Sequence, residues 1–148
     1  MAMIQLPPDF REFFQLLDSE RVEYLLVGGY AVGYYGYPRA TGDLDIWVAL
    51  TPANAAGLAR VLRRFGFSAK TASASLFLRE NALVRIGVPP LRIDLLTSVT
   101  GIEFAECYAR RTQTLLDGVE VSIVSLDHLR TNKRAIARAK DLDDLDHL

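Results

Sequence analysis

Two short stretches determine how this chain is organised: Val27-Gly28-Gly29-Tyr30 and Arg39-Ala40-Thr41-Gly42-Asp43-Leu44-Asp45-Ile46-Trp47-Val48. The second ends in Ile, Trp and Val and predicts a buried strand, yet Asp43 and Asp45 interrupt it. Side chains at positions i and i+2 of a strand lie on one face, with roughly 7 Å between their α-carbons. Two carboxylates placed this way repel each other unless they are solvated or bound by cations.

A third acid interrupts a later apolar run, Leu91-Arg92-Ile93-Asp94-Leu95-Leu96. If the two strands are neighbours, Asp43, Asp45 and Asp94 gather at one site, where such carboxylates can bind two divalent cations about 3.5–4 Å apart. Ligands that are all oxygen atoms suit Mg²⁺ or Mn²⁺ better than zinc. The alternative for each residue is a structural aspartate at a strand end or solvated edge, because Asp-x-Asp alone is a weak motif.

The glycine pair Gly28-Gly29 follows the apolar run Val22 to Val27 and precedes an expected short helix. Because glycine has no side chain, a phosphate can approach the backbone N–H groups at such a helix N-terminus. The pair also fits a simple tight turn between strand and helix. The glycine and lysine spacing of a P-loop is missing from the chain.

Helices and strands alternate outward from these stretches. Apolar spacing and capping residues predict helices over residues 8–19, Tyr30 to Tyr35, Pro52 to about Gly66, Ile102 to Tyr108 and, with an interruption, Ser125 to Leu148. Strands are expected at Val22 to Val27, Asp43 to Leu50, Leu91 to Leu96, on both sides of Asp117-Gly118, and once or twice within residues 67–88, broken near Glu80-Asn81. The pattern indicates an α/β or α+β fold around one sheet.

Length and composition place limits on the protein class. The 148 residues are one domain's worth of sequence, and 50% of them are hydrophobic. Lys and Arg total 17 against 18 for Asp and Glu, which argues against nucleic-acid or membrane binding driven by bulk charge. Cys107 is the only cysteine, and neither a signal peptide nor an apolar run long enough to span a membrane is visible. We therefore expect a cytoplasmic protein.

Taken together, these motifs resemble those of the nucleotidyltransferase superfamily, whose minimal fold is like that of polymerase β. Its signature is a helix-opening glycine pair, Asp-x-Asp on a strand and a third acid on a later strand. The stretch from Val27 to Asp45 is similar to the branch that contains abortive-infection type toxins and lincosamide nucleotidyltransferases. So is the closing run Lys133-Arg134-Ala-Ile-Ala-Arg138-Ala-Lys140-Asp141-Leu-Asp-Asp144-Leu. The resemblance implies one nucleotidyltransferase-like domain over residues 1–148, a mixed central sheet flanked by helices, with its core at about 22–125 and a helical segment at about 126–148.

The resemblance implies a metal-dependent enzyme that moves a nucleoside monophosphate from a nucleoside triphosphate such as ATP to an acceptor hydroxyl and releases pyrophosphate. Asp43, Asp45 and Asp94 would be the catalytic and metal-binding residues, with Mg²⁺ or Mn²⁺ as cofactor. The residues that the resemblance places against the nucleotide are Gly28, Gly29, Arg39, Thr41 and Lys133. Lys140 and Asp141 would instead form a structural ion pair or help to position the site.

The acceptor is the least defined partner: a small molecule, a tRNA or a protein. Only about 54 residues follow Asp94, too few for a second core that would hold it, so a homodimer or another partner is plausible. A narrower hypothesis makes the chain the toxin of a type IV-like toxin–antitoxin pair. The alternatives are a non-catalytic nucleotide-binding or interaction module that keeps the fold, and a structural domain whose strand acids are merely solvated.

Overall fold

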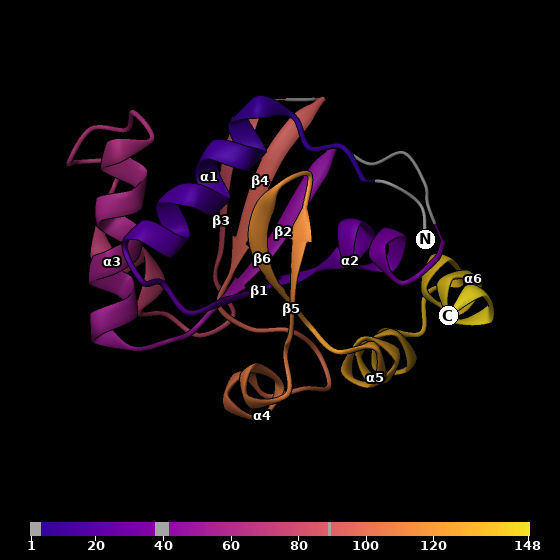
Figure 1. Cartoon of the computed structure of the whole chain (residues 1–148). Helices are drawn as coiled ribbons and strands as arrows, with labels where there is room; N and C mark the ends of the chain where they lie inside the picture. The colour runs from indigo at the N-terminus through magenta and orange to yellow at the C-terminus, as the bar shows by residue number, and fades with distance from the viewer. Residues whose placement is uncertain (1–3, 38–41, 89) are drawn as a thin grey trace.

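The computed structural model describes residues 4–37, 42–88 and 90–148. A six-stranded sheet with the order β3-β4-β2-β1-β6-β5 forms its centre (Figure 1). The strands are β1 (Tyr24–Val27), β2 (Asp43–Val48), β3 (Leu83–Val88), β4 (Leu91–Leu96), β5 (Thr112–Leu116) and β6 (Val119–Ile123). The helices are α1 (Pro8–Ser19), α2 (Gly28–Tyr34), α3 (Pro52–Arg64), a short 3₁₀ turn η1 (Ala74–Phe77), α4 (Phe104–Ala109), α5 (Leu126–Ile136) and α6 (Ala139–His147). The predicted fold class, a mixed sheet flanked by helices in a single domain, is confirmed.

The sheet is mixed because two of its neighbouring pairs are parallel. Strand β2 runs parallel to β4, and β1 runs parallel to β6. The other neighbours, β1 with β2, β3 with β4 and β5 with β6, are antiparallel. The chain crosses from β2 through α3 and β3 before it reaches β4, so the two strands that carry the acids become neighbours.

One face of the sheet is apolar and packs against α1 and α3. The alternate residues Leu44, Ile46 and Val48 of β2 are fully buried there. Phe14 of α1 packs against Tyr24 of β1, with ring centroids 5.8 Å apart. Figure 1 shows α1 and α3 lying on this side of the strands. The period of two in a strand therefore sends Asp43 and Asp45 to the opposite face.

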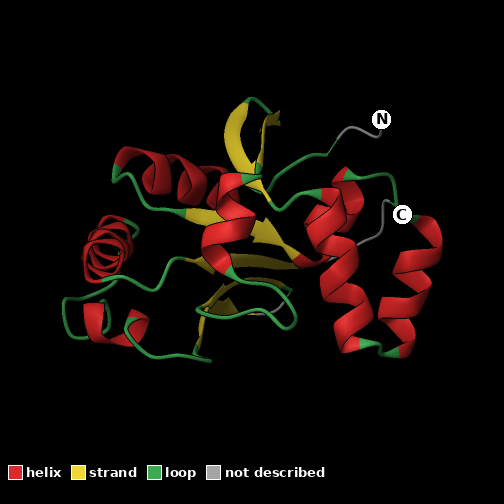
Figure 2. Cartoon of the chain, turned by 90° about the horizontal axis from the view of Figure 1, so that it is seen from below, coloured by secondary structure: helices red, strands yellow, loops and turns green. Residues whose placement is uncertain are grey.

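The opposite face is covered only in part. Helix α2 packs against β1 and β2, and Trp47 meets Phe104 of α4 edge to face at 5.1 Å. Helices α5 and α6 lie side by side (Figure 2). Among the described residues, no helix is long and apolar enough to span a bilayer.

Local sequence explains where several elements begin and end. Thr51 caps α3 because its hydroxyl accepts a hydrogen bond from the Asn54 N–H, as expected for a threonine placed before a proline. Asp117 and Gly118 both have positive φ, which gives the hairpin turn between β5 and β6 the twist that the strands require. Ala137 adopts the left-handed conformation and separates α5 from α6.

The structure makes two expectations about elements more definite. Of the one or two strands expected within residues 67–88, one is present, β3, and it begins just after Glu80-Asn81, whereas residues 67–82 form loops and the turn η1. The turn η1 contacts α3, and the buried side chains of Ala72 and Phe77 anchor this segment. Helix α2 starts at Gly28, two residues before the expected start at Tyr30.

Candidate active site

The three acids of the sequence motif lie on two adjacent strands. In the parallel pairing of β2 with β4, Asp45 is directly opposite Asp94, and Asp43 is directly opposite Arg92. The expectation that these strands are neighbours is therefore confirmed. Residues directly opposite each other share a face, so the three carboxylates lie on the face that α1 and α3 leave uncovered.

Two of the three acids form cross-strand pairs with arginines. Arg92 Nε and Nη2 donate to the two oxygens of Asp43 at 3.0 and 3.1 Å. Arg85 of β3 is opposite Asp94 and donates to its two oxygens at 3.0 and 3.4 Å. The hydrogen bond from Arg92 holds the pKa of Asp43 below its usual value. Each of these two acids thus faces an arginine on a neighbouring strand.

Asp45 is the acid without such a partner among the described residues. Burial raises its pKa to about 6, and the charges of Asp94 and Asp43 act in the same direction. The positive charges of Lys140 and Lys133 oppose this effect but do not cancel it. The centre of the cluster therefore carries negative charge that a bound cation would stabilise.

Gly28 lies directly against the Asp45 carboxylate. A Cβ atom at this position would stand 2.1 Å from Asp45 Oδ2, and Gly28 has φ +70°, a conformation that side chains rarely adopt. Both facts require glycine as the first residue of α2. Gly29 is the second residue of the same helix and is half-buried. The structure thus places the predicted glycine pair beside the predicted acids.

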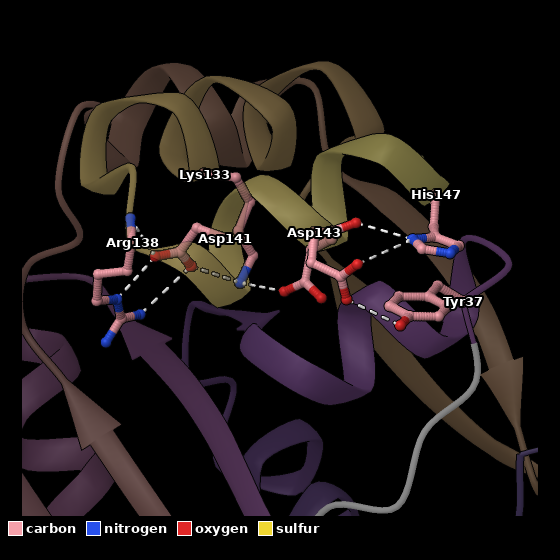
Figure 3. A network of polar contacts seen from close by, with 7 residues as sticks. Tyr37, Lys133, Arg138, Asp141, Asp143 and His147 are labelled. Atoms are coloured by element: carbon pink, nitrogen blue, oxygen red, sulfur yellow. Dashed lines mark hydrogen bonds and ion pairs between the residues drawn. The ribbon is translucent and has the colours of Figure 1, made fainter.

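The predicted phosphate contact Lys133 lies in a buried ion network between α5 and α6 (Figure 3). Its side chain is 5% exposed, and Nζ lies 3.2 Å from Asp141 Oδ1 and 3.0 Å from Asp144 Oδ2. Burial alone would raise the pKa of Asp141, but hydrogen bonds from Arg138 and Lys133 hold it at about 2. Asp141 thus takes Lys133 and Arg138 as partners, and the alternative pair with Lys140 is not the one formed.

The two remaining predicted residues, Arg39 and Thr41, lie outside the described residues. At the end of the described segment that precedes them, Tyr37 stacks on His147 of α6 at 3.8 Å between ring centroids, and its hydroxyl donates to Asp143 Oδ2 at 2.9 Å (Figure 3). The chain that leads toward Asp43 is therefore tied to the C-terminal helix.

Sequence reasoning missed the arginine partners Arg85 and Arg92, and for Lys140 it left open an ion pair with Asp141 or a role in positioning the site. Lys140 is exposed, yet its charge lowers the pKa values of both Asp43 and Asp45. A signal for Arg92 was present, since it stands at i−2 from Asp94 and so shares its face. Arg85 could be found only from the register of β3 against β4, which no local pattern specifies.

The donor atoms fit a hard divalent cation, but the described side chains do not form a ready-made site. Carboxylate oxygens are the ligands that Mg²⁺ and Mn²⁺ prefer. Within residues 4–37, 42–88 and 90–148, no group of three or more His, Cys, Asp or Glu side chains is arranged to hold a metal ion. The reason is visible in the pairs described above: guanidinium groups occupy the oxygens of Asp43 and Asp94.

Comparison with known proteins supports the fold. A crystal structure of a "putative nucleotidyltransferase" from Thermotoga maritima is similar over 96% of this chain and 93% of that one, with a TM-score of 0.64 and 14% sequence identity. At this identity the likeness concerns the fold. No family model and no curated protein sequence matches the chain.

Proposed function

We propose that the chain is a metal-dependent nucleotidyltransferase that moves a nucleoside monophosphate from a nucleoside triphosphate to an acceptor hydroxyl and releases pyrophosphate. One observation carries the proposal: the parallel register of β2 and β4 brings Asp43, Asp45 and Asp94 together beside Gly28. Asp94 is buried and Asp45 is half-buried, and acids withdrawn from water on one sheet face are costly unless a cation or a reaction uses them. The fold that the chain shares with the Thermotoga protein agrees with this function.

Each residue would have a role that follows from its position. Asp45, which is flanked by two acids and lacks an ion-pair partner among the described residues, is the best placed to bind a cation. Asp43 and Asp94 would complete the ligand set, and Asp94 could also orient the acceptor hydroxyl through its second oxygen. Lys140 adds an exposed positive charge near the acids, where it can attract the triphosphate.

A pair of Mg²⁺ or Mn²⁺ ions bound here would neutralise the charge that develops on the attacking and leaving oxygens. The protein itself supplies orientation. Gly28 keeps the space beside Asp45 free of a side chain, and Tyr37 ties the segment before β2 to α6. Arg39, Thr41 and Lys133 remain proposed nucleotide contacts.

The test is incubation of the purified chain with each α-labelled nucleoside triphosphate, Mg²⁺ and a cell extract, followed by separation of labelled RNA, protein and small molecules. Wild type should transfer label and release pyrophosphate. Asp45→Asn should lower transfer by at least 10²-fold, and Asp127→Asn, a variant at an exposed position of α5, should not. Undiminished transfer by a folded Asp45→Asn variant would refute the proposed role of the acids.

A second function has one specific observation in its favour. The arginine pairs of Asp43 and Asp94 occupy the oxygens that metal ions would need, as expected for a module that binds nucleotide without reacting. The same incubation separates the two functions. Tight binding of a Mg²⁺–nucleotide complex with no transfer to any component of the extract would favour the non-catalytic module.

The acceptor and the partners belong to the same proposal. We propose that the acceptor is a tRNA, a protein or a small molecule, and that a second subunit or an antitoxin completes its binding site. The toxin hypothesis predicts that expression arrests growth and that the Asp45→Asn variant is harmless. Equal growth of cells that express either form would refute it.

A further inference from the structure

The charged residues on the open sheet face form a regular pattern across three strands. The row of residues that are directly opposite each other reads Asp45, Asp94 and Arg85 on β2, β4 and β3. The next row pairs Asp43 with Arg92. In the part of the chain that the structure describes, two of the three acids therefore face a guanidinium, and each guanidinium makes two hydrogen bonds to its carboxylate.

The two arginines can leave their partners without unfolding the sheet. Arg85 lies on β3, at the edge of the sheet, and 48% of its side chain is exposed. The side chain of Arg92 is 26% exposed. Arginine has a long, flexible side chain, and a guanidinium recognises a phosphate with the same two-pronged geometry as a carboxylate. The carboxylate of Asp94, by contrast, is buried at 8% exposure and is fixed in the sheet.

We propose that Arg85 and Arg92 make the binding of metal and nucleotide interdependent, because they neutralise Asp94 and Asp43 in the empty site and move to phosphate oxygens when a divalent cation takes the carboxylates. This inference rests on the proposed function and adds to it that the site prefers a cation bound to a triphosphate over a free cation. A free cation must break both arginine–aspartate pairs, and it brings no anion with which the two guanidinium groups could pair instead. A cation that is already bound to a triphosphate brings phosphate oxygens with it, and the two guanidinium groups can pair with these oxygens.

The competing interpretation is that both pairs only stabilise the sheet. Opposite charges in cross-strand positions contribute little to stability when they are partly exposed. Both interpretations allow metal affinity to rise when the arginines are removed, because the carboxylate oxygens become free. A structural role predicts that a triphosphate analogue tightens metal binding equally in wild type and in the variant without the arginines. The proposed role predicts that this effect of the analogue depends on the arginines.

The test measures Mn²⁺ binding to the full chain by isothermal titration calorimetry at pH 7.5 and low salt. We expect the double variant Arg85→Gln/Arg92→Gln to bind Mn²⁺ at least tenfold more tightly than wild type. Asp45→Asn in the same background should abolish the gain. The control is Arg60→Gln, which removes an arginine of α3 that is about as exposed as Arg85 from its pair with Glu20, at 2.8 Å, and should change Mn²⁺ affinity less than twofold.

A second titration measures the interdependence itself. A non-hydrolysable nucleoside triphosphate analogue should tighten Mn²⁺ binding to wild type by tenfold or more and should have a much smaller effect in the double glutamine variant. Arg85→Lys/Arg92→Lys should recover part of this effect, since it restores the charges. Circular dichroism establishes that each variant is folded, and the single variants serve if the double variant is not.

The results of the two titrations test the inference separately from the transfer assay, which tests the proposed function. Unchanged or weaker Mn²⁺ binding by a folded double variant would overturn the inference even if wild type transfers labelled nucleotide. Tighter Mn²⁺ binding that depends on Asp45, together with a reduced effect of the analogue, would support the inference even if no acceptor in the extract becomes labelled.

Discussion

Asp45 shows how a single residue links local sequence to the site. Its position two residues after Asp43 in an apolar run is a local pattern, and that pattern predicted a shared face. What the pattern could not reveal is that Asp45 stands opposite another acid rather than an arginine, since that depends on which strands pair and in what register. The consequence is a carboxylate whose charged form is disfavoured in the free protein.

The first prediction concerns the charge of Asp45. Its folded pKa of about 6 lies above the ordinary value of 3.8, so the folded chain holds the proton more tightly than the unfolded chain does. The fold therefore loses stability as the pH rises from about 4 to about 6, and this loss is complete above pH 6. Asp45→Asn removes this charge and should raise the melting temperature of the metal-free protein at pH 8 by several degrees, which is on the order of 1–2 kcal/mol. At pH 4 the two proteins should melt within about 1 °C of each other.

The measurement is differential scanning calorimetry in the presence of a chelator. Asp146→Asn, at an exposed position near the end of α6, is the matched control and should leave the melting temperature unchanged at both pH values. A lower melting temperature for Asp45→Asn at pH 8 would contradict the prediction.

The second prediction concerns Gly28. Alanine there must adopt a positive φ and displace the Asp45 carboxylate, so Gly28→Ala should destabilise the protein by about 2–4 kcal/mol. Gly33 lies in the same helix with an ordinary φ, and a Cβ atom added there would meet no atom within 4 Å, so Gly33→Ala should be neutral or stabilising. Urea denaturation followed by circular dichroism measures both.

A double-mutant cycle identifies the cause of the Gly28 effect. If the carboxylate is responsible, Gly28→Ala should cost less in an Asp45→Ala background, because the nearest clashing atoms are gone. Equal costs in the two backgrounds would assign the whole effect to backbone strain.

At the scale of helices and strands, elements with local signals were predicted well. The cap at Thr51 and the Asp117-Gly118 turn depend on neighbouring residues, and both are present as expected. Whether residues 67–88 hold one strand or two was left open, because a strand needs a partner; β4 has β2 and β3 on its two sides, and one strand, β3, is formed. The partners of Lys133 were also hidden, since they depend on how α6 folds back on α5.

The third prediction concerns this helix pair. Lys133→Met removes the cation that the carboxylates of Asp141 and Asp144, both with no exposed surface, share. Removing one partner of a buried ion pair costs about 3–5 kcal/mol. The urea midpoint should fall accordingly, whereas Arg134→Met, a change at the next and exposed residue of α5, should shift it by less than about 0.5 kcal/mol.

The same variant distinguishes the two roles of Lys133. A purely structural lysine predicts loss of stability and, at a temperature where the variant is still folded, unchanged affinity for the triphosphate analogue. A lysine that contacts phosphate predicts at least tenfold weaker binding of the analogue. A urea midpoint equal to that of wild type would contradict the structural role.

At the scale of the whole molecule, the sequence sufficed for the fold class and for the residues that the candidate site brings together, but not for the ion pairs that those residues form. Three strand acids and a glycine pair are short local motifs, and the parallel neighbours β2 and β4 bring them together. The charge balance that the composition shows as a net −1 is also present locally, since arginines from β3 and β4 offset two of the three acids. Which arginine pairs with which aspartate depends on the order and register of the strands in the folded sheet.

The last prediction is the dependence of global stability on pH, which combines groups with opposite shifts. Asp141 has its pKa held at about 2, so its ion pairs stabilise the fold above pH 4 and this contribution is lost as the pH falls toward 2. Asp45 has a pKa of about 6, so stability declines as the pH rises from 4 to above 6. The two effects together predict that the metal-free wild type is most stable near pH 4, where the gain from Asp141 is complete and the loss from Asp45 begins, as measured by urea midpoints between pH 3 and 8.

The variants separate the two limbs of this curve. Asp45→Asn should flatten the decline above pH 5, because the group that loses its proton there is gone. Asp141→Asn should remove much of the loss below pH 4 and lower stability at pH 5. Addition of Mn²⁺ with the triphosphate analogue should reverse the slope above pH 5, since the cation favours the ionised carboxylates. A wild-type midpoint that rises steadily from pH 5 to 8 without metal would show that Asp45 does not carry the excess charge that the proposed site requires.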